Sequence, residues 1–168
     1  MSGWIDQAWT ALHTLQGPPA YGLVLGLLVA SGFFLPVNED LLLVAAAALT
    51  LKGLMQPPLL VLVAWAGIVT ADALVFHWGR VFGARALENR WAARVLPPAR
   101  LARAQAAIRR WGPLCIMAAR FLPGLRTPIY FAAGSLRLPY RQLFLYDGAA
   151  AAAEIPLVVY AVRWFGER

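Results

Sequence analysis

Two arginines lie inside an otherwise apolar region in the sequence Arg120-Phe121-Leu122-Pro123-Gly124-Leu125-Arg126-Thr127-Pro128. An arginine at the centre of a bilayer costs at least a few kcal/mol, so charges at that depth usually face a cavity, pair with an acid or mark a substrate path. The prolines also interrupt a regular helix, because proline removes a backbone hydrogen bond. The sequence therefore predicts an irregular, charged segment that the rest of the chain holds within apolar surroundings.

The composition is that of a membrane protein. Hydrophobic residues make up 61% of the 168 residues and charged residues only 14%, and the mean hydropathy is +0.63. These values lie outside the usual range of soluble chains. A net charge of +7 would favour nucleic acid as the partner of a soluble chain, but in membrane proteins positive loops orient the spans and meet anionic headgroups. We therefore expect a polytopic membrane protein with no nucleic-acid partner.

The first third of the chain predicts a surface helix followed by a hairpin. Residues 1–17 have the apolar spacing of an amphipathic helix at the membrane interface. Residues 18–51 are apolar except for Pro36, Glu39 and Asp40 in the middle. Two acids facing lipid would be costly, and irregular backbone at that depth is tolerated only where protein or water covers it. We therefore expect a re-entrant hairpin of two short helices here.

The rest of the chain predicts two spans, a basic loop and a second hairpin. Residues 57–83, which contain Asp72, and residues 140–165 are long enough to cross a bilayer. Residues 84–112 hold seven arginines, so the positive-inside rule makes this loop cytoplasmic and available to anionic headgroups. Residues 113–136 repeat the interrupted pattern of the first hairpin. Within the basic loop we expect a second surface helix, with an apolar face formed by Leu101, Ala104, Ile108 and Trp111.

The two hairpins are related by an internal repeat. Phe34-Leu35-Pro36 recurs 87 residues later as Phe121-Leu122-Pro123, and at this offset Glu39 corresponds to Arg126. Each unit, a hairpin followed by a span, crosses the membrane once, so the two copies would have opposite orientations, as in inverted-repeat transporters. We expect all-α architecture in which the hairpin tips face each other and an acid of the first tip pairs with an arginine of the second.

The same residues resemble the DedA family, also called the SNARE-associated or VTT-domain family. The resemblance extends from about Gly32 to Tyr160, and the arginine-containing stretch is its most specific part. Two positions depart from the family pattern. Asn38, just before Glu39, stands where Gly or Ser is commoner, and Glu154 stands where a tryptophan or other apolar residue is expected. The motifs that carry the resemblance are Pro36 to Asp40, Asp72, Phe76 to Arg80, Gly83, Trp111-Gly112, Arg120 to Arg126, Ala133-Gly134 and Asp147-Gly148.

The resemblance implies a multi-pass inner-membrane protein that moves lipids between leaflets. Bacterial members are associated with the recycling of undecaprenyl phosphate or phospholipids, often with dependence on the proton-motive force, and eukaryotic relatives are described as scramblases. By this resemblance Arg120 and Arg126, with Glu39 and Asp40, bind the phosphate, while Glu39, Asp40 and Asp72 exchange or relay protons. Arginine suits this role because its forked, delocalised cation matches phosphate. A homo-oligomer is one option for the assembly.

Two other functions are compatible with buried charges. A scaffold or assembly protein could use them only to specify its structure. An enzyme acting on lipid phosphates would need a nucleophile or a metal site, but His13 and His77 lie far apart and the carboxylates lack the spacing of a divalent-metal transferase. We therefore expect no enzyme, no metal and no cofactor. For Asp147 and Glu154, pairing with Arg141 and lining the cavity both remain open.

Overall fold

The computed structural model describes residues 17–31, 39–83, 85, 96–122 and 125–166. The helix predicted for residues 1–17 and the tip of the first hairpin lie largely outside these ranges, as do two residues of the second tip. All regular structure in the described ranges is helical, which agrees with the predicted fold class. The helices are α2 (Pro18–Ser31), α3 (Glu39–Leu51), α4 (Pro57–Phe82), α6 (Pro98–Trp111), α7 (Leu114–Arg120), α8 (Arg126–Ser135) and α9 (Tyr140–Gly166).

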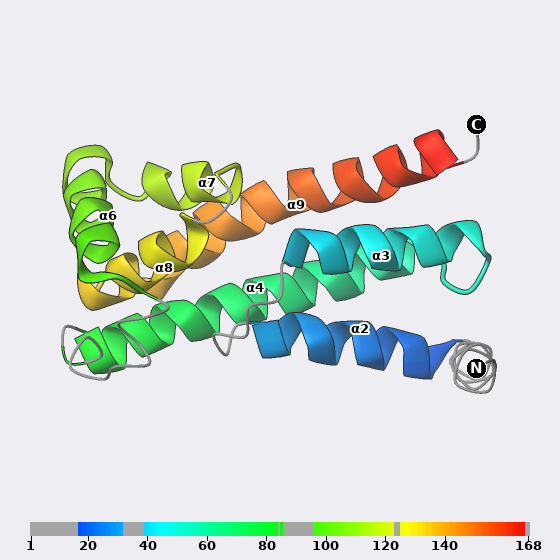
Figure 1. Ribbon diagram of the computed structural model, residues 1–168, viewed down its shortest axis with the longest axis horizontal. Coiled ribbons are helices and arrows are strands. Elements are labelled where there is room, and N and C mark those ends of the chain that lie inside the picture. Colours follow the sequence, from blue (N-terminus) through cyan, green and yellow to red (C-terminus); the bar gives the residue numbers. More distant parts are fainter. Residues whose placement is uncertain (1–16, 32–38, 84, 86–95, 123–124, 167–168) are drawn as a thin grey trace, which may run out of the picture.

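Two long helices, α4 and α9, run the length of the molecule in opposite directions (Figure 1). Each is preceded along the chain by two shorter helices, α2 and α3 in the first case and α7 and α8 in the second. The pair α2 and α3 lies along one end of the long helices, and the pair α7 and α8 lies toward the other end (Figure 1). The end of α2, the start of α3, the end of α7 and the start of α8 therefore lie near the middle of the molecule (Figure 1).

Both long helices are long and apolar enough to cross a membrane. Pro57 and Pro58 open α4, where proline is tolerated because the first N–H groups of a helix have no partner within it. The outward-facing side chains of several helices are large and apolar, which suits contact with lipid chains rather than with water. Among them are Leu23, Leu27, Leu41, Leu62, Leu145 and Leu157.

The interior consists of two apolar cores. One surrounds α8 and is filled by Tyr130, Phe76 and Phe131, each almost completely buried. The other joins α2 and α3 to α4 and α9, with Leu28 and Leu60 fully buried. The long helices contribute to both cores, so they connect the two halves of the molecule.

Helices α4 and α8 approach so closely that glycine is required on both. A methyl group at Gly79 would overlap the carbonyl oxygen of Phe131, and one at Gly134 would overlap the carbonyl oxygen of Phe76. The obstacle in each case is backbone, which cannot rotate away as a flexible side chain does. Small residues of this kind allow helices in membranes to pack backbone against backbone. This glycine crossing, Gly79 with Gly134, fixes α8 against α4.

Helix α6 differs from the expected surface helix. Leu101, Ala104 and Ile108 are buried as predicted, but they face the protein core around α8 rather than a membrane surface, and Trp111 is exposed. The predicted apolar face is therefore present for these three residues, and in the structure it packs against protein; an amphipathic pattern is compatible with burial against either protein or lipid. The Gln105 side chain also donates a hydrogen bond to Ser135 Oγ of α8, at 3.1 Å.

Candidate functional site

Three charged residues of the shorter helices lie at helix ends. Glu39 is the first residue of α3, Arg120 the last residue of α7 and Arg126 the first residue of α8. Asp72 comes from α4, and its residue is only 3% exposed. Helices that begin and end inside an apolar region leave unpaired backbone groups there, so these ends are natural places for polar side chains.

Asp72 binds both arginines. Its Oδ1 accepts a hydrogen bond from Arg126 Nε at 3.1 Å, and its Oδ2 accepts one from Arg126 Nη2 at 2.5 Å. Oδ2 also accepts a bond from Arg120 Nη2 at 3.3 Å. A paired contact between a guanidinium fork and a carboxylate is the strongest common form of this interaction. The sequence predicted Asp72 as a relay, and the structure places it at the centre of the charges.

Glu39 contacts Arg126, as the repeat predicted. Glu39 Oε2 lies 2.9 Å from Arg126 Nη1, and Ser31 Oγ donates a hydrogen bond to Glu39 Oε1 at 2.9 Å. The two side chains are 16% and 17% exposed, more than the other groups around Asp72. Asp40 is not brought to the arginines: it is exposed and makes no ion pair within the part of the chain that the structure describes.

Arg120 forms ion pairs with three acids. Besides Asp72, Asp147 Oδ1 lies 3.3 Å from its Nη2 and Glu154 Oε2 lies 3.2 Å from its Nε. Of the two roles left open for Asp147 and Glu154, pairing with Arg141 is not the one observed: both acids contact Arg120, and Arg141 is exposed at the start of α9. The sequence did contain a signal for this contact. Asp147 and Glu154 are seven residues apart and therefore lie on one face of a helix, and two buried acids on one face need a nearby cation.

Tyr130 contacts both Arg126 and Asp147, an acid that pairs with Arg120. Its hydroxyl donates a hydrogen bond to Asp147 Oδ1 at 2.5 Å, and its ring lies beneath the Arg126 guanidinium, 5.9 Å from the ring centroid. The side chain is fully buried. We refer below to the six charged residues joined by ion pairs as the arginine–carboxylate cluster: Arg120, Arg126, Glu39, Asp72, Asp147 and Glu154.

We expect Tyr130→Phe to destabilise the folded protein by about 1–3 kcal/mol, because Asp147 loses its hydroxyl donor while it stays buried. The other Asp147 oxygen, Oδ2, already has no hydrogen-bond partner among the described residues. The change keeps the ring under Arg126, so only the hydrogen bond is removed. Thermal unfolding in detergent measures the effect, and Tyr146→Phe, in a less buried position on the same helix as Asp147, is the control. Equal unfolding midpoints for the two variants would contradict this role of the hydroxyl.

The electrostatics of the arginine–carboxylate cluster favour exchange of anions at Arg126. The first turn of a helix carries partial positive charge, which stabilises anions and disfavours cations. Arg126 occupies the first position of α8, so the negative charges of Glu39 and Asp72 offset the unfavourable placement of its positive charge. Glu39 contacts only Nη1 of Arg126, at 2.9 Å, so a phosphate oxygen can take its place there while Asp72 keeps its contacts with Nε and Nη2.

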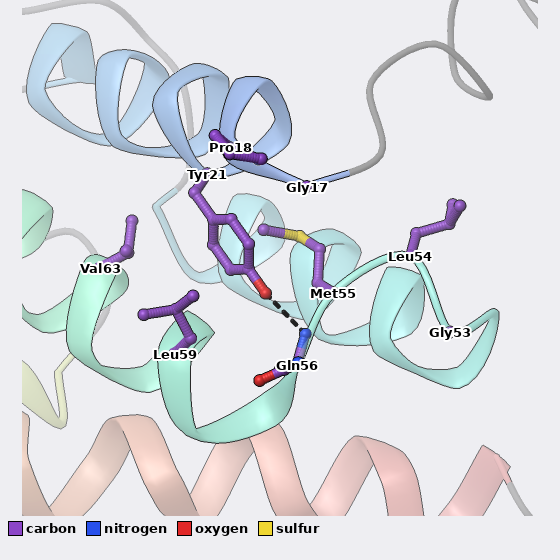
Figure 2. A pocket seen from close by; sticks show the side chains of 9 residues that line it. All are labelled: Gly17, Pro18, Tyr21, Gly53, Leu54, Met55, Gln56, Leu59 and Val63. Atoms are coloured by element: carbon purple, nitrogen blue, oxygen red, sulfur yellow. Dashed lines mark hydrogen bonds between the residues drawn. The ribbon is translucent and has the colours of Figure 1, made fainter.

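A separate hollow of about 580 Å³ lies where the start of α2 meets the turn between α3 and α4. The Gln56 backbone N–H donates a hydrogen bond to the Tyr21 hydroxyl across it, at 2.7 Å (Figure 2). The described residues that line it carry no charge. It therefore lacks the groups that would bind phosphate, and the arginine–carboxylate cluster remains the candidate site.

The comparisons with known proteins agree with this fold and these motifs. A family model described as the VTT domain matches residues 35–163, which include the whole arginine–carboxylate cluster. The chain therefore belongs to the VTT-domain family of membrane proteins, the family of DedA.

Two relatives illustrate the similarity. An uncharacterized membrane protein of Haemophilus influenzae is 32% identical over 145 residues, covering 83% of this chain and 68% of that protein. Protein DedA of Escherichia coli K12 is 32% identical over 135 residues, covering 79% of this chain and 60% of DedA. No solved structure matches the chain significantly.

Proposed function

We propose that this protein moves a phosphate-bearing lipid, a phospholipid or a polyprenyl phosphate such as undecaprenyl phosphate, between the leaflets of the inner membrane. In this proposal it is a multi-pass transporter and not an enzyme. The shorter helix pairs form two re-entrant hairpins of an inverted repeat, and the basic loop contacts anionic headgroups. The family membership and the outward-facing apolar surface support the membrane setting.

The observation that carries the proposal is the contact between Glu39 and Arg126. It joins the first residue of α3 to the first residue of α8, and these side chains are among the more exposed of the cluster. A lipid phosphate that reaches Arg126 displaces Glu39, while Asp72 keeps the guanidinium in place through its two hydrogen bonds. The cluster can then release the phosphate when Glu39 returns.

The acids provide for proton exchange in this cycle. A carboxylate that leaves its arginine in apolar surroundings favours the protonated form, because burial penalises the charge. Glu39 is the acid that leaves Arg126 in this cycle. Asp72 contacts both Arg126 and Arg120, so it connects Glu39 with Arg120. Asp40, one residue further along α3, provides an exposed carboxylate near the same helix end. Transport coupled to protons would use these groups.

The test is lipid transport in proteoliposomes. We expect Arg126→Ala to lower the rate of movement of labelled phospholipid or polyprenyl phosphate at least tenfold, because no other guanidinium in the cluster has comparable exposure. Arg141→Ala, which removes a positive charge at an exposed position of α9, should transport at the parental rate. If Arg126→Ala moves both lipids as fast as the parent protein, the proposed function is wrong.

A scaffold protein is the second candidate, favoured by the burial of Arg120 and its acids. Their side-chain exposure is 0% for Arg120 and Asp147 and 4% for Asp72, and buried ion pairs can serve to specify a structure. The double variant Glu39→Gln with Arg126→Gln removes the exchangeable pair together. If this variant stays folded and its expression still complements a deletion strain, the scaffold function is favoured over transport.

A further inference from the structure

The two arginines differ in how fully acids neutralise them. Arg120 has three carboxylates within 3.3 Å, from Asp72, Asp147 and Glu154. When a lipid phosphate has displaced Glu39, the cluster still contains these three carboxylates and only two guanidinium groups. Any bound anion therefore meets a negative surplus, and the size of the resulting repulsion depends on how much charge the anion brings.

Glu154 is the acid through which this surplus can be adjusted. Its side chain is 18% exposed, whereas those of Asp72 and Asp147 are 4% and 0% exposed. Asp72 and Asp147 accept hydrogen bonds, but Glu154 accepts none among the described residues and makes only its ion contact with Arg120 Nε. It is therefore the least constrained partner of Arg120. The charged groups that act on Glu154 are Arg120, Arg126, Asp40 and Asp72.

We propose that Glu154 is a specificity-determining residue that makes the site select lipid phosphodiesters, with one negative charge, over lipid phosphomonoesters. The inference rests on the proposed function and narrows its substrate class. Glu154 adds a third carboxylate beside Arg120, so a phosphate that binds Arg126 meets a surplus of negative charge. A ligand with one negative charge is repelled less by this surplus than a ligand with two.

The physical basis is that repulsion grows with the charge of the ligand. A phosphate monoester carries about 1.5 to 2 negative charges at pH 7, whereas a diester carries one. At an effective dielectric constant of about 20 the carboxylate of Glu154 repels a dianion about twice as strongly as a monoanion at the same place. At this dielectric constant one additional negative charge on the ligand corresponds to a selectivity of about tenfold when the Glu154 carboxylate lies about 12 Å from the phosphate.

The experiment compares two lipids that differ only at the phosphate. Labelled phosphatidylmethanol, a diester, and labelled phosphatidic acid, a monoester, with the same acyl chains, are followed in proteoliposomes at pH 8, where the monoester is almost fully dianionic. We expect the parent protein to move the diester about tenfold faster. Glu154→Gln, which removes the charge and keeps the shape, should reduce this ratio about tenfold by raising monoester transport.

Three further variants make the result specific. Glu154→Asp retains the charge and should retain most of the parental ratio, whereas Glu154→Ala, a second neutral variant, should behave like Glu154→Gln. Asp40→Asn removes a more exposed charge on the neighbouring helix α3 and should change the ratio less, because water screens it.

The outcomes separate this inference from the proposed function. If Glu154→Gln and Glu154→Ala keep the parental ratio while Arg126→Ala abolishes transport of both lipids, the specificity role is wrong and the proposed function stands. A parent protein that prefers the monoester also overturns the specificity role. If Arg126→Ala transports both lipids at parental rates, the proposed function is wrong and the inference falls with it.

Discussion

Asp72→Asn is expected to lower the free energy of unfolding by about 3–5 kcal/mol, because the buried guanidinium donors that Asp72 holds lose their charged hydrogen-bond acceptor. Asp72 contacts both guanidinium groups at once. The asparagine side chain has one oxygen and no charge, so it cannot accept the hydrogen bonds that the two Asp72 oxygens accept. Arg120, whose side chain is 0% exposed, cannot turn to water to recover its hydration.

Thermal unfolding of the purified protein in detergent measures this loss. Asp40→Asn is the matched control, since it makes the same chemical change at an exposed acid in the first turn of α3. We expect the control to unfold within a few degrees of the parent protein, because exposed charges contribute little to stability. An Asp72→Asn variant as stable as this control would show that the arginines do not depend on Asp72.

Gly134→Ala is expected to destabilise the protein by about 3 kcal/mol, at the upper end of the usual cost of overpacking. The added methyl group would overlap the Phe76 carbonyl oxygen and approach the Arg80 backbone nitrogen. Relief requires that α8 and α4 move apart, which also loosens the packing of Phe131 and Tyr130. The same unfolding measurement applies, and the variant should also reduce lipid transport because α8 carries Arg126.

The control for this change is Gly26→Ala on α2. Gly26 is exposed, and a methyl group there would meet no atom within 4 Å. Alanine is favoured over glycine in a helix by about 1 kcal/mol, so this variant should be as stable as the parent protein or more stable. Equal destabilisation by the two substitutions would mean that the tight crossing of α4 and α8 is absent in the folded protein.

Sequence alone predicted the part of the site that depends on local pattern. Glu39 and Arg126 stand at corresponding places of two similar segments, and their contact is one of the pairings between an acid and an arginine that the sequence repeat predicted. The long helices were also predictable, because a run of apolar residues must be helical to cross a bilayer. Their observed bounds differ from the predicted ones by one residue at the C-terminal ends.

The remaining site residues could not be predicted because they depend on how helices rotate against one another. The spacing of Asp147 and Glu154 indicates that one face of α9 meets a cation, but whether that cation is Arg120 or Arg141 is decided by which face of α9 packs against α7. Tyr130 looked like one more aromatic residue in an apolar segment, and only its position beside Asp147 gives its hydroxyl a role. The apolar face of α6 is a similar case, since its pattern does not distinguish protein from lipid.

The glycine crossing between α4 and α8 has a mechanical consequence. Two helices whose backbones touch at Gly79 and Gly134 move as one rigid body, so Asp72 on α4 and Arg126 at the start of α8 keep a constant spacing. Glu39 belongs to α3, which makes no such backbone contact with α8. In the proposed transport cycle we therefore expect α3 to move away from α8 when Glu39 separates from Arg126, while α4 and α8 stay in contact at Gly79 and Gly134.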